Sequence, residues 1–186
     1  TDGAMEGPMI SQSVVIKNAP PVVTVSILPE DPKTTDHLVA SVSIIDADGD
    51  SVESSMSWLV DGEPTGMEGG TVFAENTRRG EEWTVVVNPT DGSQAGLETQ
   101  ASVVIGNSLP EISTVVLGPD PGHKGAILEP TIEAWDADGD DIAFTYAWNI
   151  AGTVVLDGEQ NELSGSWFEQ GQTVFVTVTP RDDVGD

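Results

Sequence analysis

Two acidic loops carry the residues best suited to chemistry in this chain. The sequence Asp-Ala-Asp-Gly-Asp occurs at 46–50 and again at 136–140. Carboxylates at alternate positions, with a glycine that lets the backbone fold back, can direct several oxygens at one point, as a calcium ion requires. Because Asp and Gly also favour turns for backbone reasons, a plain solvated turn is the alternative. The pattern predicts two Ca²⁺ sites, with Asp46, Asp48 and Asp50 in one and Asp136, Asp138 and Asp140 in the other.

Other metal sites and catalytic centres find little support. An EF-hand loop needs a Glu at its twelfth position, where this chain has Ser57. His37 and His123 lack a second His or a Cys at the spacing of a transition-metal site. Motifs of nucleophilic, zinc-dependent and phosphate-binding enzymes are missing, and the clustered carboxylates suit a cation better than glycoside hydrolysis. We therefore expect no enzymatic activity.

Charge restricts the partners. The chain has 32 acidic and 6 basic side chains, which gives a formal net charge of -26. Such a charge repels phosphate backbones and anionic membrane surfaces, so nucleic acid is not an expected partner. No apolar run is long enough to insert into a membrane. Since self-repulsion destabilises a compact acidic module, divalent cations are the leading expected partner.

The chain repeats itself at a spacing of about 90 residues. Thr1–Pro21 aligns without a gap on Thr90–Pro110, and Trp58 recurs as Trp148. Fixed-period similarity indicates tandem modules. We expect the last strand of a preceding repeat at 1–16, a first repeat at 17–106 and a second, incomplete repeat at 107–186.

Short β-branched runs bounded by Gly, Pro, Asp and Asn predict strands, and no window has a helical apolar stripe. Strand signals every ten or so residues favour an all-β fold of two antiparallel sandwiches. The expected strands are 22–27, 39–45, 57–60, 83–87 and 102–105 in the first repeat, and 112–117, 131–135, 144–150 and 173–179 in the second.

The second repeat stops just after Pro180-Arg-Asp-Asp183, so it lacks its own last strand. Residues 1–16 have the sequence of that missing strand but lie at the other end of the chain. Two explanations stay open. Either the sequence is a segment of a longer array, or copies join head to tail by β-strand addition.

The Asp-Ala-Asp-Gly-Asp loop, the strand with Trp, the Pro-x-Asp-Gly turn and the Ser-Val-Val-Ile-x-Asn junction together resemble the immunoglobulin-like repeats of large bacterial surface proteins. They are similar, more distantly, to cadherin-like and polycystic-kidney-disease-type repeats. The polycystic-kidney-disease pattern is incomplete, because Trp58 is followed by Leu-Val-Asp-Gly62. The resemblance implies two tandem immunoglobulin-like domains with an extracellular or cell-surface location, and any export signal and anchor are expected outside these residues.

In an immunoglobulin-type sandwich, the loops carrying the two acidic motifs lie at the same end as the turn before the last strand. We therefore expect Asp91 near the first motif, and Asp182 and Asp183 near the second. The opposite end of the first repeat carries Glu30, Asp31 and Asp36. A calcium ion that bridges the two repeats would draw on Asp136, Asp138, Asp140 and Asp182. Glu30, Asp31 or Asp36, together with Asn107 or a nearby carbonyl, could complete this site.

Trp58 and Trp148 are predicted to fill the sandwich cores. Trp83, Trp135, Trp167 and Phe168 could instead stack on sugars, which leaves a carbohydrate-binding module as one alternative. A filament subunit joined by donor-strand exchange is the other. The leading expectation is a calcium-stiffened stalk or filament segment, involved in adhesion or surface assembly. Its expected partners are neighbouring repeats or copies of itself, with a glycan or surface receptor as a further candidate.

Overall fold

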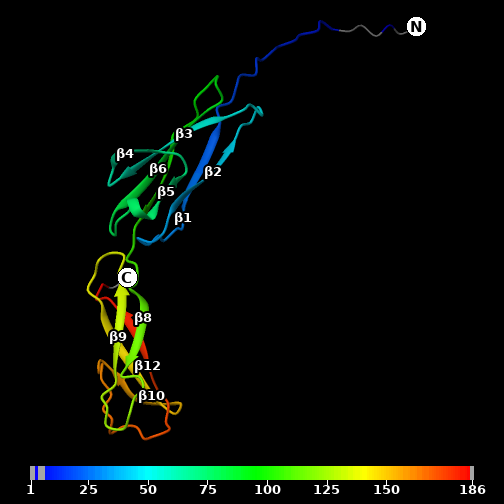
Figure 1. Cartoon of the computed structure of the whole chain (residues 1–186). Coiled ribbons are helices and arrows are strands. Elements are labelled where there is room, and N and C mark those ends of the chain that lie inside the picture. The colour runs from blue at the N-terminus through cyan, green and yellow to red at the C-terminus, as the bar shows by residue number, and fades with distance from the viewer. Residues whose placement is uncertain (1–2, 4–6, 185–186) are drawn as a thin grey trace.

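The computed structural model describes residues 3 and 7–184 of the chain. Apart from one 3-10 turn, η1 (Ala74–Asn76), their regular elements are strands, and all pairs of named strands are antiparallel. The predicted all-β antiparallel fold is confirmed. No helix in this part of the chain is long and apolar enough to cross a bilayer. The strands form two groups placed end to end, which we call the first unit (22–105) and the second unit (111–181) (Figure 1).

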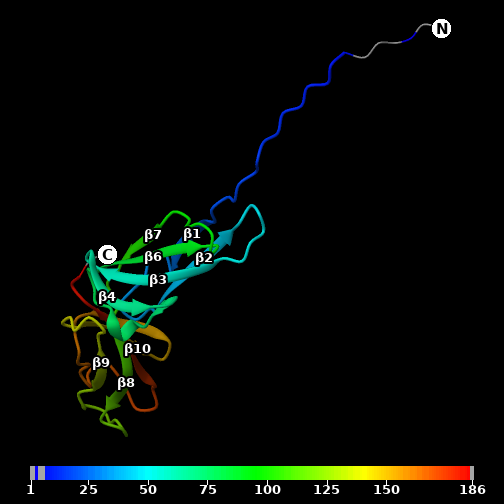
Figure 2. The same cartoon turned by 90° about the horizontal axis from the view of Figure 1, so that it is seen from above.

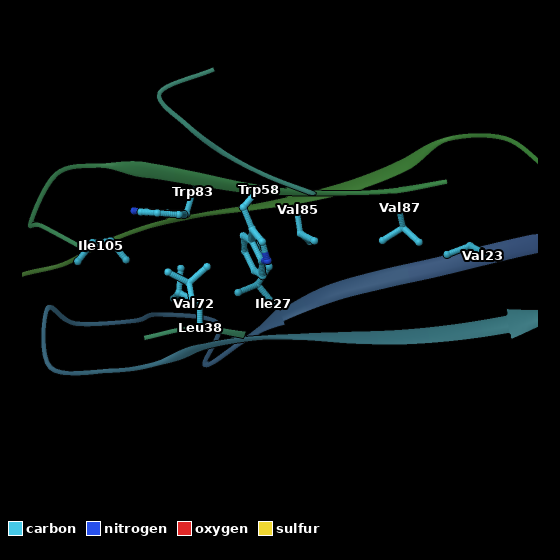
Figure 3. Close-up of a cluster of buried hydrophobic side chains, with 9 residues drawn as sticks. All are labelled: Val23, Ile27, Leu38, Trp58, Val72, Trp83, Val85, Val87 and Ile105. Carbon is cyan, nitrogen blue, oxygen red and sulfur yellow. The ribbon is translucent and has the colours of Figure 1, made fainter. Parts of the chain in front are cut away.

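The first unit contains two facing sheets, with strand orders β1-β2-β5 and β4-β3-β6-β7. The strands are β1 (Val22–Leu28), β2 (Leu38–Ile45), β3 (Glu53–Val60), β4 (Glu63–Glu68), β5 (Thr71–Val72), β6 (Glu82–Thr90) and β7 (Thr99–Val104). Alternation along β6 is clear, because Trp83, Val85 and Val87 are buried while the residues between them are more exposed. Side chains from both sheets meet in one buried cluster: Val23, Ile27, Leu38, Trp58, Val72, Trp83, Val85, Val87 and Ile105 (Figure 3).

The second unit repeats this arrangement with fewer strands. Its sheets have the orders β8-β9 and β11-β10-β12. The strands are β8 (Glu111–Gly118), β9 (Glu129–Trp135), β10 (Ala143–Ile150), β11 (Thr153–Gly158) and β12 (Val174–Arg181). Its core is a separate cluster of Leu128, Tyr146, Trp148, Ile150, Leu163 and Phe168.

The two core tryptophans lie in the same setting. Trp58 Nε1 donates to the Gly69 carbonyl at 2.8 Å, and Trp148 Nε1 donates to the Gln160 carbonyl at 2.9 Å. Both indoles are fully buried, at 1% and 0% exposure. A buried indole needs such an acceptor for its N–H group. The predicted core role of both residues is confirmed.

All nine expected strands occur, although most are longer than predicted. In the first unit β7 pairs with one edge of β6. No described strand pairs with the corresponding edge of β12. Residues 7–20, which we call the N-terminal segment, leave the far end of the first unit without joining a sheet (Figures 1 and 2). Residues 1–2 and 4–6 of the expected orphan strand, and residues 185–186, lie outside the described part.

Candidate metal centres at the ends of the two units

Each acidic motif forms the loop between two strands: β2 and β3 in the first unit, β9 and β10 in the second. The glycine of each loop has a left-handed backbone, with φ of 81° at Gly49 and 79° at Gly139, a conformation that other residues adopt only with strain. The first Asp of each loop organises the turn. Asp46 Oδ1 accepts hydrogen bonds from the Asp48 and Asp50 amides at 2.9 and 3.1 Å.

The second loop has the same geometry. Asp136 Oδ1 accepts from the Asp138 and Asp140 amides at 2.8 and 3.2 Å. In each loop the three carboxylates offer oxygens that lie within 4.8 Å of one another. We call these clusters the first triad (Asp46, Asp48, Asp50) and the second triad (Asp136, Asp138, Asp140).

One oxygen in each triad is left without a partner. Asp46 Oδ2 and Asp136 Oδ2 are both buried and accept no hydrogen bond. Burying a polar atom without a partner costs about 1–3 kcal/mol, and more when the group is charged. A cation bound at each triad would offset this cost. The triads are therefore the groups in the described chain best placed to hold calcium, since hard cations prefer carboxylate oxygens.

An asparagine connects each triad to a neighbouring loop. Asn18 Nδ2 donates to Asp91 Oδ2 at 2.8 Å, and the next amide, that of Ala19, donates to Asp48 Oδ2 at 2.7 Å. Asp91 thus lies beside the first triad, tied to it through the chain that enters the first unit.

The same pair of hydrogen bonds, one from an Asn side chain and one from the next backbone amide, recurs at the second triad. Asn107 Nδ2 donates to Asp182 Oδ2 at 2.9 Å, and the Ser108 amide donates to Asp138 Oδ2 at 2.8 Å. Both asparagines belong to the Ser-Val-Val-Ile-x-Asn repeat, so their recurrence was a visible sequence signal. Their hydrogen bonds to Asp91 and Asp182 were not predicted.

Hydrogen bonds to Asp91 affect the acidity of its carboxyl group. The hydrogen bond from Asn18, followed by the bond from the Gln94 amide, lowers the pKa of the Asp91 carboxyl below its ordinary value of 3.8. A carboxyl with a lowered folded-state pKa stabilises the fold above its unfolded pKa, and this stabilisation is lost as pH falls toward the folded value.

We expect Asn18→Ala to raise the pKa of Asp91 while leaving it below 3.8, because the Ser93 and Gln94 amides still donate to Asp91 Oδ1. The fall in stability on acidification below about pH 4 should become shallower. Titration of the side-chain carboxyl by NMR measures the shift. Asn107→Ala is the matched control and should leave Asp91 unchanged; an equal response to both variants would contradict the local origin of the effect.

The second triad lies at the junction of the two units. Thr34 Oγ1 donates to Asp138 Oδ1, and the Arg79 guanidinium forms a salt bridge with Asp140. Arg79 Nη1 also donates to Asn107 Oδ1 at 2.7 Å. The Asp140 hydrogen bond raises the pKa of Arg79 above its already high ordinary value, so this cation stays charged at all working pH values. Both units and the linker therefore contribute to one polar network.

The acidic residues expected to complete a bridging site do not join the described cluster of carboxylates within 4.8 Å of one another, which consists of Asp136, Asp138 and Asp140. Asp31 is 3.5 Å from Lys33 Nζ with an 85% exposed side chain, and Glu30 is exposed. Asp36 Oδ2 accepts from the Lys33 amide at 2.8 Å. Asp183 is exposed as well. The first unit contributes Thr34 and Arg79 to the second triad instead. The sequence did not reveal the role of Arg79, because nothing in its local sequence indicates a partner so distant along the chain.

The aromatic residues considered for sugar stacking separate into two classes. Trp83 and Phe168 are buried in the two cores. Trp135 and Trp167 are half exposed, at 48% and 50%. Trp135 borders a cavity of about 680 Å³ at the junction, which Thr34, Arg79 and Asp138 also line.

No protein-family model matches this chain, and no curated protein matches it either.

Proposed function

We propose that this chain is a structural segment of an extracellular bacterial repeat protein, built of immunoglobulin-like modules and stiffened by calcium. Its role is to hold neighbouring modules at a fixed angle within a stalk or filament used in adhesion or surface assembly. The observation that supports this best is the position of the second triad. Its carboxylates contact Thr34 and Arg79 of the first unit, the Asn107-Ser108 linker and, through Asn107, Asp182 of the second unit.

Charge gives calcium a physical role in this proposal. The whole chain has a formal net charge of -26. Arg79 partly neutralises the second triad, whereas no Lys or Arg among the described residues forms a salt bridge with the first triad. A divalent ion at either loop would reduce repulsion between carboxylates held within 4.8 Å and would bind the orphaned Oδ2 atom. An ion at the second triad would also restrain rotation between the units.

Thermal unfolding in calcium and in chelator tests the proposal. A ligand that binds only the folded state at a hundredfold excess over its Kd stabilises by about 2.7 kcal/mol, which corresponds to a rise in Tm of about 10–20 °C for units of this size. Mg²⁺ is the matched control ion, because it is smaller and demands a stricter octahedral geometry. Small-angle scattering in the same buffers should show a narrower range of particle lengths with calcium. An unchanged Tm and an unchanged scattering curve would refute calcium stiffening.

A carbohydrate-binding module is the second candidate, and the cavity beside half-exposed Trp135 favours it. Stacking of a sugar ring on this indole, with hydrogen bonds to Arg79 or Asp138, would not require calcium. Glycan-array binding that survives chelation and is lost in Trp135→Ala, but kept in Trp167→Ala, would support this candidate over a purely structural role.

A further inference from the structure

Among the residues that the structure describes, no strand pairs with the outer edge of β12, and this edge lies beside an apolar cavity. Val174, Val176 and Val178 point inward from β12 but are only half buried, whereas the corresponding β6 residues Trp83, Val85 and Val87 are at most 2% exposed. Next to Val174 lies a cavity of about 750 Å³, whose apolar wall includes Leu117, Leu128, Phe168 and Val174.

In the first unit, β7 and Ile105 occupy the corresponding place. β7 pairs along β6 with Val103 opposite Trp83 and Thr99 opposite Val87. Ile105 follows it, is 1% exposed and packs in the core with Leu38 and Trp83 (Figure 3). Its amide donates to the Glu81 carbonyl at 3.0 Å, and its carbonyl accepts from the Gly80 amide at 2.8 Å. These contacts show what a strand needs in order to close such a unit.

The N-terminal segment contains a second copy of this strand. Ser13-Val-Val-Ile16 is identical to Ser102-Val-Val-Ile105, and the alignment extends without a gap in both directions. In the described chain Ile10, Val14, Val15 and Ile16 are all more than 80% exposed. The segment leaves the end of the first unit that is remote from the second unit (Figure 1), so it cannot reach the β12 edge of its own chain.

The acceptor edge retains the backbone geometry that Ile105 uses. Gly171 corresponds to Gly80, and both are left-handed, with φ of 90° and 86°. Gln172 corresponds to Glu81, whose carbonyl accepts from Ile105. Both Gly171 and Gln172 border the cavity. The Gly171 amide and the Gln172 carbonyl of the second unit thus correspond to the donor and the acceptor that bond Ile105 in the first unit.

We propose that residues 10–16 of one copy add to β12 of a second copy as an antiparallel strand and join the chains head to tail. By analogy with β7, Val14 lies opposite Val174, Ile10 lies opposite Val178, and Ile16 fills the cavity. The joint is an interaction surface for another copy of this chain, and it does not depend on calcium binding.

The contacts at the junction between the two units indicate which contacts would form next to the added strand. Asn18 and Ala19 directly follow the added strand and hold Asp91 and Asp48, as Asn107 and Ser108 hold Asp182 and Asp138. The end of the second unit would then face the first triad of the donor copy. At the position of Thr34, which contacts Asp138, the second unit has Lys124. A basic side chain there complements a triad that has no basic partner within its own described chain.

One difference between the two copies of the strand is unfavourable for the proposed pairing. Gln12 takes the inward position that Ala101 occupies in β7, so a longer polar side chain must fit opposite Val176. Unpaired polar groups are costly when buried. We therefore expect reversible, concentration-dependent association instead of permanent polymers.

Sedimentation velocity over a wide concentration range, in chelator, tests the proposal with the whole chain. Oligomers should grow with concentration. Ile16→Asn should weaken association about 10- to 100-fold, the loss expected from one buried isoleucine. Val15→Asn is the matched control, because the corresponding Val104 is 56% exposed and points outward. Both changes lie in the exposed segment and leave the folded units intact. A monomer at every concentration, or oligomers equally affected by both variants, would overturn the proposal.

Disulfide trapping tests the register. Thr84 Oγ1 and Ser102 Oγ are 2.8 Å apart across β6 and β7, and the corresponding pair in the joint is Phe175 and Ser13. The chain has no cysteines, so Ser13→Cys with Phe175→Cys provides an unambiguous pair. Mild oxidation should give a ladder of covalent dimers and longer chains. The out-of-register pair, Ser11→Cys with Phe175→Cys, is the control; a ladder of equal yield from both pairs, or none from the first, would refute the assigned register.

Discussion

Replacing Trp148 with alanine is expected to destabilise the second unit by about 3–5 kcal/mol, because it removes a fully buried indole and leaves a cavity. The Gln160 carbonyl, which accepts from Trp148 Nε1 at 2.9 Å, would also lose its partner. A loss of this size is a large share of the stability of a small domain. The second unit is therefore expected to unfold at a much lower temperature in this variant.

The first unit should be little affected, since the two buried clusters have no residue in common. Trp58→Ala, in the other core, should lower the first unit's transition instead. Scanning calorimetry of both variants resolves the two transitions. Trp167→Ala is the matched control, because its half-exposed side chain should change stability by about 0.5 kcal/mol or less. A single transition shifted equally by Trp58→Ala and Trp148→Ala would show that the chain unfolds as one cooperative body.

Strands with regular alternation were predictable from the sequence. Each residue of β6 from Trp83 to Val87 is β-branched or aromatic, and the apolar positions alternate in burial. β4 could not be predicted in the same way, because Glu63-Pro-Thr-Gly-Met-Glu68 contains both Pro and Gly and has little β propensity. Its pairing with β3, which includes a register shift between Ser57 and Leu59, comes from tertiary contact instead of local preference.

The same distinction between local pattern and long-range contact applies to the candidate site. The triads were predictable, since the three Asp residues of each are close in sequence and a left-handed glycine brings their carboxylates together. Contacts between distant segments were not. Arg79 meets Asp140 only because the two units are placed end to end, and no local pattern encodes that placement. Glu30 and Asp31 were expected to help hold a bridging ion. Their loop does reach the linker, where the Gly106 amide donates to the Pro32 carbonyl, but Glu30 is exposed and Asp31 lies 3.5 Å from Lys33 Nζ.

The effect of Asp136→Asn should depend on calcium. Asparagine keeps the Oδ1 acceptor for the Asp138 and Asp140 amides, so the loop conformation is preserved. The change removes the charge on a carboxylate whose Oδ2 is buried without a partner. In chelator, the variant should be as stable as the parent chain or more so. In excess calcium, it should lack the stabilisation of about 2.7 kcal/mol that a site-bound ion gives at a hundredfold excess over Kd.

Asp46→Asn is the equivalent change in the first unit, and calorimetry should show each variant losing the calcium response of its own unit only. Glu133→Gln, an exposed site on β9, is the charge-matched control and should keep both responses. Equal calcium responses in Asp46→Asn, Asp136→Asn and Glu133→Gln would show that calcium acts through general charge screening. Equal destabilisation of Asp136→Asn in calcium and chelator would show that the Asp serves only the turn.

Arg79 is expected to make the calcium responses of the two units unequal. Its guanidinium already contacts Asp140, so calcium at the second triad must compete with or bind beside a fixed positive charge. The first triad has no such salt bridge among the described residues. The first unit is therefore expected to respond to calcium at lower concentrations than the second. Arg79→Gln should bring the second response closer to the first, because the junction then depends on the bound ion for the charge that Arg79 supplied.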